Sequence, residues 1–439
     1  MTDISIGNVM VASAPPRRRD IGLGRRYRAE RRFRIYGLLA ISVGLMFLAV
    51  MLVSIVSKGY TAFWQTAVTL PITFDEKIID PNGKRDGDPN VLIAANYPKL
   101  AENALIAKLG IDPSDKAMVR KLKGFLSDGV RAQLREMVVR DPSIVGMTRD
   151  VDVLASANLD SAFKGQIDLG VDEARRKVSD QQVEWMNKLR DEGVISGHFN
   201  AGLFTYGASS RPETSGMGVA IIGSLYMMAI VLLLALPIGV AASIYLEEFA
   251  KKSRLTDIIE VNINNLAAVP SIVFGLLGLA VFINFLGLPR SASLVGGLVL
   301  TLMTLPTIII ATRAALAAVP PSIRSAALGL GASKMQMVFH HILPLAAPGI
   351  LTGTIIGLAR ALGETAPLLL IGMVAFVADY PTTPFDPATA LPVQIYMWAN
   401  EAERAFVERM SAAIIVLLIF LMAMNITAIV LRRRFERRW

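Results

Sequence analysis

The sequence predicts an all-α integral membrane protein with six transmembrane helices and one extra domain outside the bilayer. Its 439 residues are 53% hydrophobic and 18% charged, whereas soluble globular proteins are about 45–50% apolar and about 25% charged. Apolar stretches of the roughly 20 residues that cross a bilayer occur six times. Disordered, coiled-coil and purely soluble enzyme classes are therefore excluded.

The six predicted spans are long, apolar and poor in charge. They cover residues 36–57, 218–246, 264–287, 293–318, 346–377 and 410–431. The first span is longer than the apolar core of a cleavable signal peptide, and its basic leader is more extended. We therefore expect it to be retained as a membrane helix.

Arginine placement predicts the orientation. Nine arginines lie between Arg17 and Arg34, and five follow the last span: Arg432, Arg433, Arg434, Arg437 and Arg438. Basic residues stay on the cytoplasmic side of a membrane, so both basic tails, 1–35 and 432–439, are expected in the cytoplasm. We expect a multi-pass protein of the bacterial inner membrane, with the lipid bilayer as a partner.

The first span leads into segment 58–217, which the orientation places in the periplasm. This segment holds 22 of the 36 acidic and 21 of the 45 basic residues. Apolar side chains recur at three- and four-residue spacing across 116–139 and again across 173–190, which predicts a largely helical domain. It shows no catalytic constellation, and its acids are interpreted as a solvated surface, with partner contact as the alternative. Five helices, in residues 218–431, would follow it.

Several kinds of chemistry are excluded by what the sequence lacks. It has no cysteine and three histidines, which leaves little material for a metal centre or a catalytic triad. It has no GxxxxGK[ST] loop, so we expect no ATP binding by this chain alone. The arginines flank apolar spans rather than a soluble face, which argues against nucleic acid. No catalytic residue, cofactor or metal is predicted.

The predicted cytoplasmic loop 319–345 combines small residues with an apolar ridge. Two prolines end the preceding helix, and a short helix is expected from about Ser322. Small residues follow, and then an apolar ridge, Met335, Met337, Val338 and Phe339. Such a loop suits docking into a groove of another protein. The alternative is an amphipathic helix that lies on the membrane surface.

The predicted fifth span contains an isolated pair of charges. No Asp or Glu occurs from Val261 to Gly363, and Glu364 then follows Arg360 at a spacing of four, on one face of a helix. Each charge costs at least about 2.5–3.5 kcal/mol in a span. Either the two charges neutralise each other, so that the pair is merely tolerated in the span, or the pair forms a binding site. A guanidinium presents donors that fit phosphate and carboxylate oxygens, and Pro367 would break the helix nearby.

The loop spacing resembles the "EAA" loop of ABC importer permeases. Its usual form is Glu-Ala-Ala, three residues, Gly, nine residues, Ile, one residue and Leu-Pro; here Ser325 replaces the Glu and His341 the Ile. In that family the loop is the coupling helix that seats in the ATP-binding subunit. The resemblance implies this role for Ser325, Ala326, Ala327, Gly331, Met335, Leu343 and Pro344.

The string ARALGETAPLL at 359–369 resembles the signature of the permeases of phosphate ABC importers, and its GETAP portion is typical of their A subunit. Stretches at 269–275, 305–307 and 391–396 agree, so the similarity covers about 218–431. The long outer domain resembles an insertion found in a subset of these permeases. The resemblance implies a type I ABC importer permease fold and no enzymatic activity of this chain.

The resemblance also implies a substrate and partners. Inorganic phosphate would cross beside Arg360, Glu364 and Thr365, with Arg360 meeting the phosphate oxygens and Glu364 tuning the charge. The partners would be a homologous C-type permease, two ATP-binding subunits that hydrolyse ATP, and a periplasmic phosphate-binding protein. Another oxyanion, sulfate or molybdate, is the first alternative. A membrane sensor is the second, although it would need a larger cytoplasmic domain than tails of about 35 and 8 residues.

Overall fold

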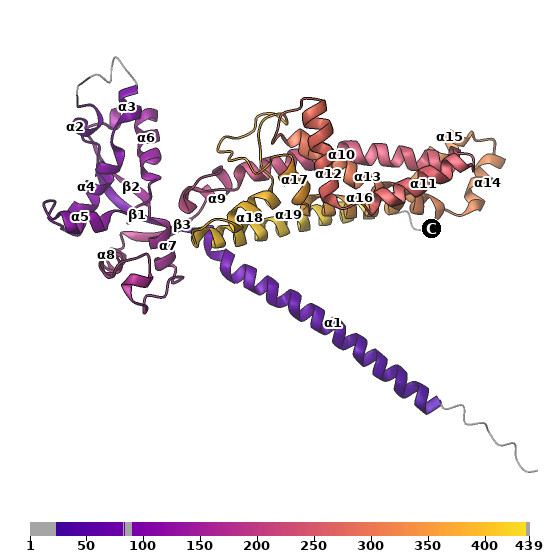
Figure 1. Ribbon diagram of the computed structural model, residues 1–439, viewed down its shortest axis with the longest axis horizontal. Helices are drawn as coiled ribbons and strands as arrows, with labels where there is room; N and C mark the ends of the chain where they lie inside the picture. Colours follow the sequence, from indigo (N-terminus) through magenta and orange to yellow (C-terminus); the bar gives the residue numbers. More distant parts are fainter. Residues whose placement is uncertain (1–22, 82, 84–89, 436–439) are drawn as a thin grey trace, which may run out of the picture. The chain divides into compact units, whose positions relative to one another are not determined.

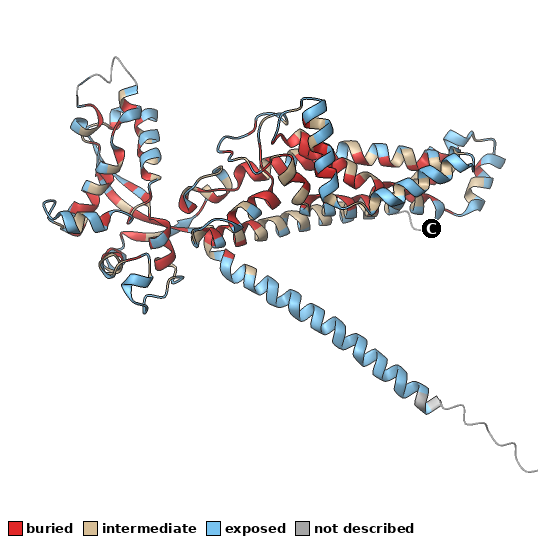
Figure 2. Cartoon of the chain, in the orientation of Figure 1, coloured by how far each residue is buried: buried red, intermediate tan, exposed pale blue. Residues whose placement is uncertain are grey.

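The computed structural model describes residues 23–81, 83 and 90–435. It separates into two compact units, residues 1–54 and 55–439. Most of the predicted N-terminal tail, and Arg437 and Arg438 of the C-terminal one, lie outside the described residues. The first unit contains most of helix α1 (Leu23–Gly59), whose last five residues belong to the second unit. Most of the large apolar side chains of α1 are exposed (Figures 1 and 2). A helix of this kind suits contact with lipid.

The second unit contains four long apolar helices. The helices α10, α13, α16 and α19 each contain a window apolar enough to cross a membrane, so with α1 there are five such helices among the described residues. Helix α13 packs against α10 and α16, and α16 against α19 (Figure 1). Their bounds are α10 (Gly218–Ile244), α13 (Ser293–Ala317), α16 (Leu343–Gly363) and α19 (Ala405–Phe435).

The third span does not begin where the sequence predicted. Helix α11 (Arg254–Ala267) and the segment formed by α12 (Ser271–Gly278) and a π-helix (Leu279–Phe285) meet at an angle of 101°. Pro270 lies between them, and proline disfavours helical backbone at the residue before it. Among the described residues, a sixth candidate span is counted if this bent pair is taken as one broken span.

The predicted fifth span is also discontinuous. Helix α16 ends at Gly363, the short helix α17 (Ala366–Leu370) follows, and non-helical backbone continues to residue 390. The break expected near Pro367 is present, because proline cannot supply the donor that an uninterrupted helix requires, but the helical part of the predicted span 346–377 ends at Leu370. Helix α18 (Leu391–Ala399) then precedes α19.

A separate hydrophobic core lies between Trp64 and Asn200, a segment that we call the inserted domain. Its centre is an antiparallel sheet in the order β2-β1-β3, in which Val68 pairs with Val153 and Gln65 with His198. The largely helical domain expected from the sequence did not include these strands. The strands are β1 (Trp64–Thr73), β2 (Thr148–Leu154) and β3 (Ile195–Phe199).

Short helices surround this sheet, so the predicted helical content of the segment is present in smaller pieces. The helix expected over 116–139 is two helices, because the chain turns at Gly124, whose φ of +86° favours glycine. The helix expected over 173–190 starts only at Asp180, after a capping box at Ser179. The helices are α2 (Glu76–Ile79), α3 (Asn90–Ala94), α4 (Tyr97–Leu109), α5 (Lys116–Leu122), α6 (Val130–Arg140), α7 (Ala157–Phe163) and α8 (Asp180–Asp191).

Close approach of α16 to α13 depends on glycine. A Cβ atom at Gly353 would lie 2.2 Å from the side chain of Ala311, and small residues of this kind allow membrane helices to pack closely. We expect Gly353→Val to destabilise the protein by about 1–3 kcal/mol, the usual range for overpacking. Thermal unfolding of the purified chain in detergent measures this. The control is Gly44→Val in α1, where no atom lies within 4 Å; equal losses in both variants would contradict the packing argument.

Candidate functional site

Arg360 and Glu364 lie where helix α16 ends. Arg360 is in the last turn, and Glu364 is the first residue after the helix, with extended backbone. Arg360 Nε lies 3.7 Å from Glu364 Oε1, and the two side chains are 47% and 20% exposed. The expected pairing is present, but it crosses a helix end and is solvent-accessible in the isolated chain.

The break beside this pair is built from Thr365 and Pro367. The carbonyl oxygen of Thr365 accepts hydrogen bonds from the backbone N–H groups of Leu368 and Leu369, both at 3.1 Å, which starts helix α17. Proline fits this first turn because its missing donor would have no partner there. Helix α17 packs closely on α12, since a Cβ atom at Gly275 would lie 2.7 Å from the Cα of Pro367.

Arg360 faces away from the helix bundle. Leu358 and Ala361 point into the core, whereas Ile356, one turn before Arg360, is 59% exposed. Arg360 stands about 26 Å along the axis from the start of α16, at 1.5 Å per residue, which is within a hydrocarbon thickness of about 30 Å. A guanidinium at such a position requires contact with protein or water rather than lipid.

The loop between α13 and α16 forms two short helices, α14 (Pro321–Gly329) and α15 (Lys334–Met337). Gly331, with a φ of +87°, lets the chain turn between them. Leu343 and Pro344, the last residues of the predicted coupling set, begin α16.

Only part of the predicted apolar ridge is on the surface. Met337 and Val338 are buried with Ala327, whereas Met335 and Phe339 are exposed. Leu330, which the sequence did not single out, is 91% exposed. The loop therefore presents an apolar surface of Leu330, Met335 and Phe339, which we call the loop surface.

Ser325, which replaces the usual Glu, makes no ion pair. Its hydroxyl donates to the carbonyl oxygen of Pro321 within the same helix, at 3.2 Å. The neighbouring Arg324 makes the ionic contact instead: its Nη2 lies 2.8 Å from Oε1 of Glu248 and also donates to the carbonyl oxygen of Leu316 at the end of α13. Glu248 lies in the π-helix that extends α10 (Tyr245–Phe249). Helix α14 is thereby tied to the ends of α10 and α13.

A second ion-pair group lies beside this one. Arg313 Nη1 is 2.9 Å from Glu260 Oε1, and its Nε is 3.5 Å from Glu247 Oε2. These pairs join α13 to α11 and to the end of α10. The sequence signal was the Glu247-Glu248 doublet after the second span, but spacing alone could not identify its partners, which are more than ten residues away in the chain.

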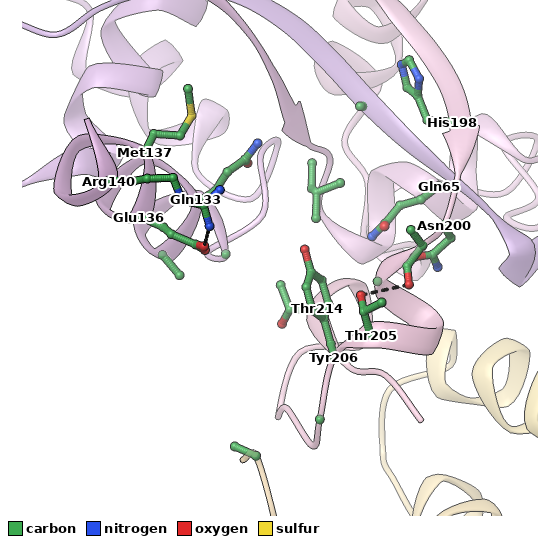
Figure 3. A pocket seen from close by; sticks show the side chains of 18 of the residues that line it. Gln65, Gln133, Glu136, Met137, Arg140, His198, Asn200, Thr205, Tyr206 and Thr214 are labelled. Carbon is green, nitrogen blue, oxygen red and sulfur yellow. Dashed lines mark hydrogen bonds and ion pairs between the residues drawn. The ribbon is translucent and has the colours of Figure 1, made fainter. Parts of the chain in front are cut away.

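A cavity lies elsewhere, lined mainly by residues of the inserted domain. It has a volume of about 870 Å³, and Arg360 and Glu364 do not line it. Its charges are already paired, with Arg140 Nη2 2.7 Å from Glu136 Oε1, so it offers no unbalanced site for an anion. Figure 3 shows Gln133, His198, Asn200 and Tyr206 around it. The described residues contain no cluster of His, Asp and Glu that could hold a metal ion.

Comparisons with known proteins agree with this architecture. Residues 235–439 match the model of the binding-protein-dependent transport system inner membrane component, and residues 20–173 match a domain of unknown function. The probable ABC transporter permease protein YqgI of Bacillus subtilis is 32% identical over 201 residues, which is 43% of this chain and 68% of the relative. The phosphate transport system permease protein PstA 1 of Mycobacterium tuberculosis is 31% identical over 255 residues, 58% of this chain and 77% of the relative.

Among solved structures, the inward-facing MetNI methionine ABC transporter matches 50% of this chain and 98% of its own, at 18% identity and a TM-score of 0.42. The sequence relatives confirm the predicted family and its multi-pass location in the inner membrane. The chain belongs to the PstA-type permeases of binding-protein-dependent ABC transporters, and its role is that of a membrane-embedded transport permease.

Proposed function

We propose that this chain is a transmembrane subunit of an ATP-driven importer that moves inorganic phosphate across the bacterial inner membrane, with both termini in the cytoplasm. The observation that carries the proposal is the position of Arg360, a guanidinium on the exposed face of α16 next to a break in the span. The names of relatives such as PstA 1 support phosphate as the substrate.

Arg360 would bind the phosphate and Glu364 would limit how tightly it is held. The ion pair with Glu364 engages one edge of the guanidinium, through Nε, which leaves the terminal Nη donors to face an oxyanion. A carboxylate 3.7 Å from Nε repels an anion and so favours its release. Thr365 lies at the break, where backbone groups are free of the regular helix pattern.

The exposed face of α16 implies a second subunit. A half-exposed arginine in a span is costly against lipid, so we infer that a homologous C-type permease covers this face and completes the route. A periplasmic phosphate-binding protein would deliver the anion at the other end of the pathway.

Two ATP-binding subunits would supply the energy, and one of them would contact the loop surface. Closure on ATP would move α14, and the Arg324–Glu248 pair would transmit that movement to α10 and α13. Alternating access then requires two packings of the bundle whose balance nucleotide shifts.

Replacing Arg360 tests the transport role. We expect Arg360→Gln to lower the initial rate of radiolabelled phosphate uptake by at least about tenfold, because a lost charge-assisted contact is worth about 1.5–3 kcal/mol. Arg360→Lys keeps the positive charge but loses the planar set of N–H donors, so its uptake rate should lie between those of the unmodified protein and Arg360→Gln. Uptake is measured in proteoliposomes with the assembled complex.

Arg290→Gln, at an exposed turn, is the control and should transport normally. Normal uptake by Arg360→Gln would refute the role of that side chain. Excess unlabelled sulfate or molybdate should not compete with phosphate. If either does, phosphate is the wrong substrate, but the role of Arg360 in binding an oxyanion still holds.

Removing the charge of Glu248 tests the transmission step. We expect Glu248→Gln to keep ATP hydrolysis but to lose most of the uptake per ATP. The loss in stability should be on the order of 2 kcal/mol, less than the roughly 3–5 for a fully buried pair, because Arg324 is 21% exposed. Glu136→Gln is the control, since it removes the charge of an exposed ion pair with Arg140 in the inserted domain. Unchanged uptake per ATP in Glu248→Gln would rule out this route.

A charge introduced on the loop surface tests whether this surface contacts the ATP-binding subunit. Leu330→Asp should abolish co-purification of the ATP-binding subunit, because a carboxylate cannot be buried in an apolar contact without a partner. Phe385→Asp, equally a change at an exposed apolar residue but in the non-helical segment between α17 and α18, should leave assembly intact. Retention of the ATP-binding subunit by Leu330→Asp would show that the contact is elsewhere.

A further inference from the structure

Ionisable side chains are buried together where the inserted domain meets helix α19. Lys164, just after α7, places its Nζ 2.7 Å from Asp160 Oδ2 and 3.1 Å from Glu408 Oε1 on α19, and all three side chains are less than 10% exposed. Arg409 is 3% exposed and lies within electrostatic reach of Asp160, Glu408 and Glu213. We call these five residues the junction cluster.

The acids of the junction cluster are held by the sheet side of the inserted domain. Asp160 Oδ1 accepts a hydrogen bond from the backbone N–H of Thr66 in β1, at 2.9 Å. Glu213 Oε1 accepts one from the hydroxyl of Ser127, at 2.8 Å, and its carbonyl oxygen accepts one from Gln65 Nε2, at 2.7 Å. Lys164 thus connects these hydrogen-bonded residues of the inserted domain to Glu408, which lies 244 positions later in the chain.

Buried ions fix position more strictly than apolar contacts do. Two apolar surfaces can slide past each other at little cost, whereas a buried charge that loses its partner is strongly destabilising. The residues beside the cluster are also closely packed. A Cβ atom at Gly59 would lie 2.7 Å from the backbone carbon of Ser411, and Trp398 Nε1 donates to Ser215 Oγ at 3.2 Å.

We propose that the junction cluster locks the inserted domain to the outer end of α19, so that the domain and this helix move as one body during transport. Lys164 is the positioning residue, acting through Glu408. This gives the inserted domain a mechanical role that does not depend on which ion is transported. The domain extends the last membrane helix into the space beyond the bilayer.

The absence of cysteine in the sequence permits a direct test with spin labels. Arg190→Cys on α8 and Arg404→Cys, just before α19, are both exposed positions, and pulsed electron spin resonance measures the distance between labels there. The full chain is studied in lipid nanodiscs and in the complex with its ATP-binding subunits, with and without trapped ATP. We expect one narrow distance distribution that is the same in every state.

Variants of the junction cluster show whether its charges hold the inserted domain to α19. Lys164→Met and Glu408→Gln should each broaden the distribution to about twice its width. The double variant should broaden it no further than Lys164→Met alone, because both changes remove the Lys164–Glu408 contact. The matched control pair lies within the inserted domain, where Lys108 Nζ is 3.3 Å from Glu192 Oε2 and both side chains are about one-third exposed. Lys108→Met and Glu192→Gln should leave the width unchanged.

Two results would overturn the proposal. One is a shift of the mean distance between nucleotide states in the unmodified cluster, which would show that the domain moves relative to α19. The other is an unchanged width in Glu408→Gln, a mild variant that keeps the Lys164–Asp160 pair and so should still fold. The nanodisc measurements need no transported ion, so they can fail without affecting the phosphate assignment.

Discussion

A charge that enters or borders the membrane must find a partner, and this constraint accounts for the arrangement of the ionic groups. Desolvating a charge costs more than most single contacts return. In this chain the ionic contacts of the long apolar helices lie near their ends or at a break: Arg360 with Glu364 where α16 stops, Arg324 with Glu248 where α10 stops, and Glu408 with Lys164 where α19 starts. Apolar packing between α10, α13 and α16 fills the spans themselves.

The sequence predicted the features that depend on local pattern. The apolar windows of α10, α13 and α19 were found because a run of about 20 apolar residues is rare outside membrane helices. The short helix after Pro321 and the Arg360–Glu364 pair were predicted from residue type and spacing. These signals are contained within a few turns of chain, so they do not depend on tertiary contacts.

Features that depend on distant contacts could not be predicted. The pairing of β1 with residues about 80 and 130 positions later could not be predicted from local pattern. The alternating apolar residues Val68, Leu70, Ile72 and Phe74 do indicate a strand, a local signal that the expectation of a largely helical domain overlooked. The bend at Pro270 sits inside an apolar stretch that hydropathy treats as continuous, and Pro367 predicted a break in the fifth span without showing that α16 ends at Gly363. The partners of Arg324 and Lys164 lie on other elements, and only the folded chain brings them together.

Helix α16 connects these separate ionic groups. It packs against α13, whose end is tied to the loop between α13 and α16 through Arg324. It also packs against α19, and Arg432 Nη1 of α19 donates to Thr352 Oγ1 of α16 at 3.4 Å. In the proposed mechanism, movement that starts at the loop would reach α16 through α13, and movement of the inserted domain would reach it through α19. Arg360 stands on a helix that contacts both α13 and α19, so in the proposed mechanism its surroundings would respond to movements of the loop and of the inserted domain.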